Sequence, residues 1–183
     1  MMPLRSLAAF PLHPAVLFTA LLGACAATPQ APAVPDTLRP PAGQVLTLTT
    51  QADGVQIYEC QAAAAGTGRY EWVFKAPEAT LTSATGTLLG KHYGGPTWEA
   101  NDGSKVVGEV RARDDGPDAA AIPWLLLGAK SNAGQGTFGR TQSVQRVATS
   151  GGKAPASPCT QAEAGRQARV PYRAVYHFYG PKG

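Results

Sequence analysis

The sequence feature that most constrains the fold of this chain is the alternation of apolar and polar residues at every second position. Near the C-terminus, alternate residues share one apolar face: Val170, Tyr172, Ala174, Tyr176 and Phe178. The same period recurs at 45–50 and 55–60, and in the run where Tyr70, Trp72 and Phe74 share a face. A period of two is typical of strands that bury one face. It predicts that Trp72 belongs to the core.

Turn-forming residues separate these segments. The chain has 21 glycines and 16 prolines, and only 15% of its residues are charged, which favours many turns over long helices. Asp53-Gly54 predicts a turn, and Asn101-Asp-Gly-Ser104 predicts a hairpin. The apolar run 122–127 fits a short helix opened by Pro123, but a buried strand starting there suits the surrounding pattern better.

We therefore expect an all-β fold, a single-domain antiparallel β-sandwich or small β-barrel with long loops and about eight to ten strands. Residues 161–167 predict one or two helical turns. The expected domain covers residues 42–179 and is followed by a short tail, 180–183.

The N-terminus has the layout of a secretory signal peptide, expected at 1–24. Arg5 precedes an apolar segment at 15–22, which is shorter than the ~20 residues that span a bilayer. The segment ends in Leu22-Gly-Ala-Cys25, which resembles the bacterial lipobox. That resemblance implies diacylglycerol on the Cys25 thiol and, with Ala26 following, attachment to the outer membrane. The alternative is cleavage near Ala27, which gives a soluble secreted protein.

Residues 25–41 contain the lipid site and then a proline-rich stretch, which predicts a stiff tether. The expected partner at this end is the membrane itself, through the lipid anchor. No oligomeric state is predicted.

The cysteine count agrees with lipidation. The chain has three cysteines, and a lipid on Cys25 leaves Cys60 and Cys159 to form a disulfide in an oxidising compartment. The alternative is two buried free thiols. A bridge would close a loop of about 100 residues, worth about 4–5 kcal/mol through loop-closure entropy.

Six ordered blocks give the chain a family resemblance: 54–60, 90–104, 122–127, 143–147, 151–155 and 170–179. From about Pro35 to Tyr179 the chain resembles the family called domain of unknown function 3455. The resemblance implies an exported protein with a single domain. It implies no catalytic residue.

Motifs for cofactor, metal or covalent chemistry are weak. Residues 134–139 match G-x-G-x-x-G, but a strand pattern follows them and the next acidic residue is Glu163, so we interpret them as a flexible loop. His92 and His177 lack zinc-ligand spacing, and G-x-S-x-G is missing from the sequence. We expect no catalytic residue, no cofactor and no metal.

Five residues are candidates for ligand binding: His92, Trp98, Glu99, Asp102 and Trp124. Tryptophan rings offer stacking faces to sugars, aromatic groups or lipids. The alternative is that Trp98 and Trp124 fill the core, that Asp102 forms a turn and that Glu99 is a solvated strand position.

Charge is unevenly distributed along the chain. Residues 25–118 contain seven basic and eleven acidic residues, whereas residues 119–183 contain eight basic and one acidic. A shared surface of the later arginines (140, 146, 166, 169 and 173) would attract an anionic envelope polymer or a lipid headgroup. The alternative, which we favour, is that acidic and basic strands pair across the sheet. The exported location disfavours nucleic acid.

Two functions remain as hypotheses. The first is a membrane-anchored binding or structural module of the cell envelope. The second is an enzyme that acts on envelope or extracellular carbohydrate, with Glu99 and Asp102 or His92 as acid and base. Glycoside hydrolysis needs two carboxyl groups about 5–9.5 Å apart across a cleft.

Overall fold

The computed structural model describes residues 33–63 and 68–182. Its elements, in chain order, are η1 (Asp36–Leu38), β1 (Gln44–Ala62), β2 (Tyr70–Thr82), β3 (Leu88–Tyr93), β4 (Thr97–Ala100), β5 (Lys105–Asp114), β6 (Trp124–Ala133), β7 (Ser143–Gly151), η2 (Gln161–Glu163) and β8 (Gln167–Pro181). The expected signal peptide and Cys25 lie outside the described residues. Within the described part, no helix has the length and apolar character needed to cross a bilayer.

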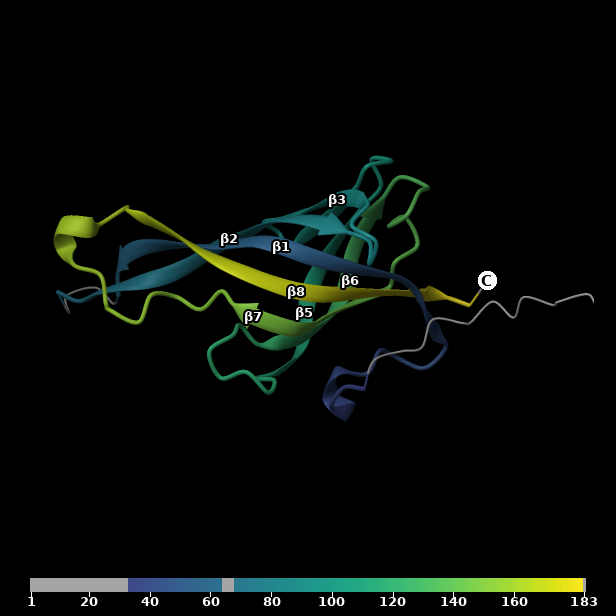
Figure 1. The fold of residues 1–183 in the computed structure, drawn as a ribbon, viewed down its shortest axis with the longest axis horizontal. Coiled ribbons are helices and arrows are strands. Elements are labelled where there is room, and N and C mark those ends of the chain that lie inside the picture. Colours follow the sequence, from purple (N-terminus) through teal and green to yellow (C-terminus); the bar gives the residue numbers. More distant parts are fainter. Residues whose placement is uncertain (1–32, 64–67, 183) are drawn as a thin grey trace, which may run out of the picture.

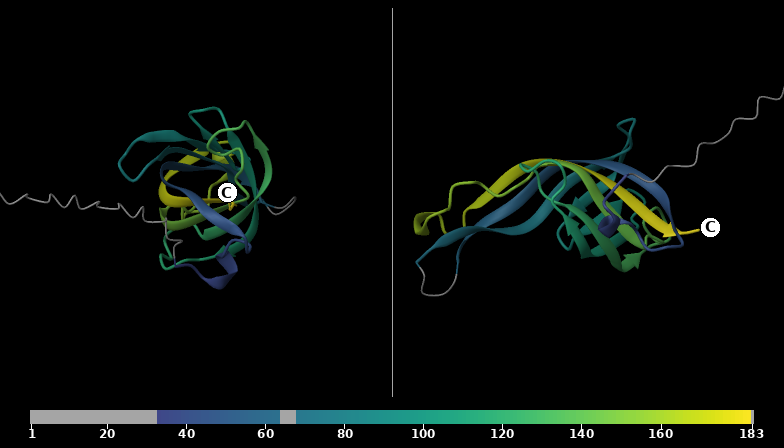
Figure 2. Two further views of the ribbon diagram at one scale, coloured as in Figure 1. Left: turned by 90° about the vertical axis from the view of Figure 1, so that its right-hand side faces the viewer. Right: turned by 90° about the horizontal axis from the view of Figure 1, so that it is seen from below.

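The strands form one closed antiparallel sheet. Each pairs with its neighbour in sequence, and β8 returns to pair with β1 from Gln44 to Glu59. The end view in Figure 2 shows the strands curving into a ring, although an irregular one. The all-β expectation is confirmed, and of the two architectures considered it is the barrel type that forms.

Three strands are much longer than the rest. The ends of β1, β2 and β8 extend beyond the ring as an arm, with η2 at its tip (Figure 1). A disulfide joins Cys60 on this arm to Cys159, 99 residues later in the sequence. The predicted bridge is therefore confirmed, and it ties the loop before β8 to the arm.

Inward-facing side chains fill one end of the ring. Phe138, in the loop between β6 and β7, is fully buried, and its ring centroid lies 4.5 Å from that of Phe178 on β8. Leu81, Val106 and Val144 pack in the same cluster. Phe138 thus closes one end of the ring, because its loop folds across that end.

Asp53-Gly54 does not form the predicted turn. Both residues lie inside β1, paired with Thr80 and Ala79 of β2. A Cβ on Gly54 would lie 2.1 Å from the backbone oxygen of Glu78. The glycine therefore permits close approach of two strands, a use of glycine that local sequence does not distinguish from a turn.

Trp72 is not part of the core, contrary to expectation. It lies half-buried on the arm, where its Nε1 donates a hydrogen bond to the Ser157 carbonyl oxygen at 3.1 Å. The side chains of β2 do alternate at Trp72, but this first part of β2 belongs to the arm and does not face the core of the ring. A bulge follows, since Tyr58 pairs with Phe74 and Ile57 with Ala76, which leaves Lys75 as the extra residue.

Other local predictions are confirmed. The hairpin turn at 101–104 connects β4 and β5, β6 begins directly after Pro123, and one short helical turn, η2, follows Cys159. At the N-terminal side, η1 lies within the range expected for the tether. Its Leu38 is fully buried, and the Leu38 oxygen accepts a hydrogen bond from Gln145 Nε2 at 2.5 Å.

Candidate functional site

A cavity of about 480 Å³ occupies the end of the ring from which the arm extends. Its walls come from β1 to β8 and from the loop between β5 and β6. Phe138 fills the opposite end, whereas Phe74 and Val110 are exposed at this end, so the cavity is accessible here. Its volume lies within the range of small-molecule sites, about 300–1,000 Å³.

Three aromatic rings form the deepest wall. His92 of β3 and Trp98 of β4 are direct partners in the sheet, and their rings stack with centroids 4.5 Å apart and planes inclined by 12°. Tyr176 of β8 meets both edge-on, at 5.1 Å from His92 and 5.4 Å from Trp98. All three are at most 2% exposed, so this wall is preformed.

His92 is neutral at ordinary pH. Burial lowers its pKa, the hydrogen bond to Thr97 O opposes that shift and the charge of Arg146 adds to it, giving a pKa of about 3. Its Nδ1 lies 2.8 Å from the Thr97 oxygen. Because a carbonyl can only accept, Nδ1 carries the proton and the tautomer is fixed.

The mouth of the cavity combines exposed apolar side chains with cations. Phe74 is 49% exposed and Val110 is 56% exposed, and both line the opening. The bulge in β2 brings Lys75 to the opening beside Phe74, because the extra residue changes the alternation at that point. Arg113 lines the mouth from β5 and pairs with Asp115 at 2.9 Å.

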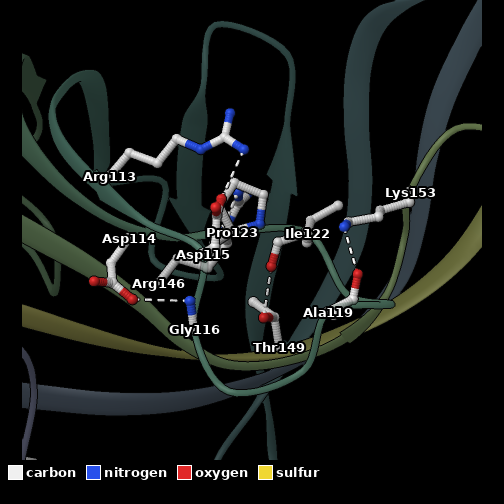
Figure 3. A network of polar contacts seen from close by, with 10 residues as sticks. All are labelled: Arg113, Asp114, Asp115, Gly116, Ala119, Ile122, Pro123, Arg146, Thr149 and Lys153. Atoms are coloured by element: carbon white, nitrogen blue, oxygen red, sulfur yellow. Dashed lines mark hydrogen bonds and ion pairs between the residues drawn. The ribbon is translucent and has the colours of Figure 1, made fainter.

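The loop between β5 and β6 forms one side of the cavity, and several polar contacts hold it (Figure 3). Asp114 Oδ1 accepts from the Gly116 amide at 2.8 Å, and Thr149 Oγ1 donates to the Ile122 oxygen at 2.6 Å. Arg146 donates to the Pro123 oxygen from Nε at 3.1 Å and from Nη2 at 2.9 Å. The loop is thus fastened to β7.

The wall of the cavity is rich in hydrogen-bond donors. Trp98 Nε1 is buried and has no acceptor among the described residues, whereas the Gln56 amide interacts with the Tyr172 hydroxyl. Gln56 and Trp98 both line the cavity. The described lining residues include Lys75, Arg113 and Arg146 but no aspartate or glutamate. The described wall therefore provides positive charge and an unpaired hydrogen-bond donor, but no carboxylate.

Of the five residues expected to bind a ligand, His92 and Trp98 lie together in this cavity. Glu99 does not, because the residue after an inward Trp98 faces outward. On the outer surface its Oε2 accepts from the Tyr93 hydroxyl at 2.7 Å and lies 3.1 Å from Lys105 Nζ. The Tyr93 hydrogen bond and then Lys105 lower the pKa of Glu99.

Asp102 has a structural position. Its Oδ1 accepts from the amide and hydroxyl of Ser104, at 2.9 and 2.5 Å. Its Oδ2 accepts from the amide and hydroxyl of Thr137, at 2.8 and 2.7 Å. These four hydrogen bonds hold the pKa of Asp102 well below its usual range, and the bond from the Ser104 hydroxyl has the largest effect. Asp102 therefore joins the β4–β5 turn to the glycine-rich loop that carries Phe138.

Trp124 and His177 also lie apart from the cavity. Trp124 is half-buried at the start of β6, where it packs so closely on the preceding β5–β6 loop that a Cβ on Gly116 would lie 2.8 Å from Trp124 Nε1. His177 Nδ1 lies 2.9 Å from Thr49 Oγ1 on the outside of the ring. The acid and base of the carbohydrate hypothesis, Glu99 with Asp102 or His92, are thus not brought together. No cluster of three or more potential metal ligands occurs within the described ranges.

The later arginines do not form one surface. Arg173 pairs with Asp53 at 2.7 Å and Arg169 with Glu78 at 2.9 Å, so acidic and basic strands pair across the sheet. Arg166 pairs with Glu163 at 2.6 Å. Arg146 instead faces the cavity, a role that we did not predict. The signal was present, since Arg146 alternates in phase with the buried Val144.

Fold and cavity together define a class: an all-β, ring-closed domain with a ligand-sized cavity. The profile of the family described as "Protein of unknown function (DUF3455)" matches residues 41–180. The chain therefore belongs to this family, as its sequence blocks indicated. No curated protein and no solved structure gives a significant match.

Proposed function

We propose that this chain is a lipid-anchored protein of the cell envelope whose ring of strands binds a small, largely apolar molecule. The preformed aromatic wall of His92, Trp98 and Tyr176 carries the binding half of the proposal, because it lines an accessible cavity of about 480 Å³. Sites for small molecules are concave, mostly apolar and provided with a few polar groups. The lipobox-like segment ending at Cys25 supports the location.

Direct titration tests the binding function. The chain carrying Cys25→Ser is purified and titrated by calorimetry with 2-naphthamide and 2-naphthoate, planar probes that suit the aromatic wall. We expect saturable binding of at least one probe at one site per chain. If neither of these probes binds, and neither do the aliphatic probes decanoate and decanamide, the proposed function is rejected.

A matched pair of variants locates that site. Val110→Trp places a large ring in the mouth of the cavity and should weaken binding about tenfold or more. Leu88→Trp is the control, because Leu88 is 55% exposed, close to the 56% of Val110, but does not line the cavity. Equal affinities in the two variants would contradict binding in the cavity.

A further inference from the structure

Arg146 is a cation directed into the ring. It lies on β7 between Leu125 of β6 and Tyr176 of β8, with which it is in direct register. All three residues line the cavity. The charge of Arg146 acts on the surrounding rings: burial raises the pKa of Tyr58 and of Tyr176, and Arg146 opposes the shift in both.

Arg146 has no acidic partner in the part of the chain that the structure describes. Arg113, the other arginine that lines this cavity, differs in this respect, since it forms an ion pair with Asp115. Arg146 also interacts with the Tyr176 hydroxyl by a side-chain hydrogen bond. In the contacts shown in Figure 3 it donates twice to a neutral carbonyl, the Pro123 oxygen. These contacts orient the guanidinium while leaving its other N–H groups for a ligand.

A partly buried cation that lacks a counter-ion is unfavourable until an anion pairs with it. The unpaired donor of Trp98 acts in the same direction, because it too requires an acceptor. A guanidinium matches a carboxylate in shape and can donate two parallel hydrogen bonds to it. The rest of the wall is apolar, with Ile122, Leu125 and Leu127 beside the aromatic rings.

We propose that the ligand is an apolar molecule carrying a single carboxylate, and that Arg146 pairs with this carboxylate inside the ring. The inference rests on the proposed binding function and names its ligand class. Two kinds of molecule share this chemistry, a planar aromatic acid and an aliphatic fatty acid. The test includes both.

The experiment compares each acid with its neutral isostere. The Cys25→Ser chain is titrated with 2-naphthoate and 2-naphthamide, and with decanoate and decanamide. In the otherwise unchanged chain, at least one acid should bind about 10- to 100-fold more tightly than its amide, the effect of one charge-assisted hydrogen-bonded pair. Which acid shows the preference identifies the aromatic or the aliphatic class.

Variants assign the preference to one side chain. Arg146→Gln should reduce the acid-to-amide ratio to about one, whereas Arg146→Lys, which keeps the charge, should retain much of it. Arg140→Gln is the matched control, since it removes an exposed arginine that does not line the cavity, and it should leave the ratio unchanged.

The outcomes separate the two proposals. Amide binding without a preference for the acid, or a preference that survives Arg146→Gln, overturns the carboxylate inference and leaves the binding function intact. Failure of all four probes rejects both. If Arg146→Gln does not fold, the comparison of Arg146→Lys with Arg140→Gln decides. A lower acid-to-amide ratio in Arg146→Lys supports pairing with Arg146, because an ammonium cannot donate the two parallel hydrogen bonds of a guanidinium, and equal ratios in the two variants contradict it.

Discussion

At the scale of single residues, His92 links the cavity to stability. Its pKa of about 3 in the folded chain lies below the ordinary value of 6.5. Between these values the unfolded chain binds a proton that the folded chain does not, so the free energy of unfolding falls as the pH falls. The slope for one such group is about 1.4 kcal/mol per pH unit.

His92→Gln should remove most of that slope. The comparison is made by urea unfolding between pH 6.5 and pH 5, above the range in which most carboxylates titrate. His177→Gln is the comparison, because burial also lowers the pKa of His177. Since His177 is 9% exposed and His92 only 2%, this variant should remove a smaller part of the slope. Parallel stability curves for the original chain and His92→Gln would show that His92 is not neutral in the folded state.

At this scale the sequence predicts some of the cavity residues but not others. His92 and Trp98 were chosen for their chemistry, and they do form its deepest wall. Glu99 was chosen for the same reason and faces outward, because adjacent strand residues point to opposite faces. Arg146 was not predicted. The alternation along its strand indicates which face its side chain lies on, but not that the side chain lacks a carboxylate partner. That property depends on which strands become neighbours.

At the scale of elements, the glycine-rich loop and the β4–β5 turn act as one unit. Asp102 receives hydrogen bonds from Thr137 in the loop, and Ser104 Oγ accepts from the Phe138 amide at 3.0 Å. A Cβ on Gly136 would lie 2.2 Å from Asp102 Oδ2. The glycines at 134–139, which match G-x-G-x-x-G, therefore allow this loop to pack closely against the β4–β5 turn.

Gly136→Ala should consequently destabilise the chain by about 1–3 kcal/mol, the usual range for overpacking. Gly94→Ala is the control, since its added Cβ meets only the Ala76 methyl, at 3.3 Å. Both are measured by urea unfolding. Similar stabilities would mean that the loop can move away from Asp102 without cost.

The arm is the second unit at this scale, and it depends on the disulfide. The Cys60→Ala/Cys159→Ala double variant should lose up to about 4–5 kcal/mol of unfolding free energy, since the bridge closes a long loop. Denaturation with and without reductant provides the measurement. The original chain in reductant should approach the variant, and a reductant effect of equal size on the variant would contradict this account.

The elements also show where sequence reasoning reaches its limit. The hairpin at 101–104 was predicted because its turn residues are local signals. The continuity of β1 through Gly54 was not, because the close approach of Glu78 comes from a distant strand. Trp72 alternates like a core residue, but no local pattern indicates that its strand has left the ring. Ring closure through β1 and β8 is likewise a long-range property.

At the scale of the whole molecule, the two ends of the ring differ. One end is closed by Phe138 and the other opens between the arm and the β5–β6 loop. A carboxylate paired with Arg146 would lie inside the ring, while Lys75 and Arg113 at the mouth would attract it during approach.

The proposed anchor would determine where this cavity works. Seven residues lie between Cys25 and residue 33, where the described chain begins, and this segment spans at most about 30 Å. Because η1 packs on the domain through Leu38, the rest of the expected tether adds little reach. A lipid on Cys25 would therefore hold the cavity close to a bilayer, a source of fatty acids.

Cys25→Ser tests this arrangement in the cells that produce the protein. The unchanged chain should sediment with membranes and be released by detergent but not by salt, because acyl chains contribute about 0.8 kcal/mol for each buried CH₂. The variant should appear in the soluble exported fraction. The Cys60→Ala/Cys159→Ala variant, which keeps Cys25, should remain with the membrane and serves as the control. Membrane retention of Cys25→Ser would contradict the lipid anchor without affecting the binding proposal, because the cavity is formed entirely by residues after η1.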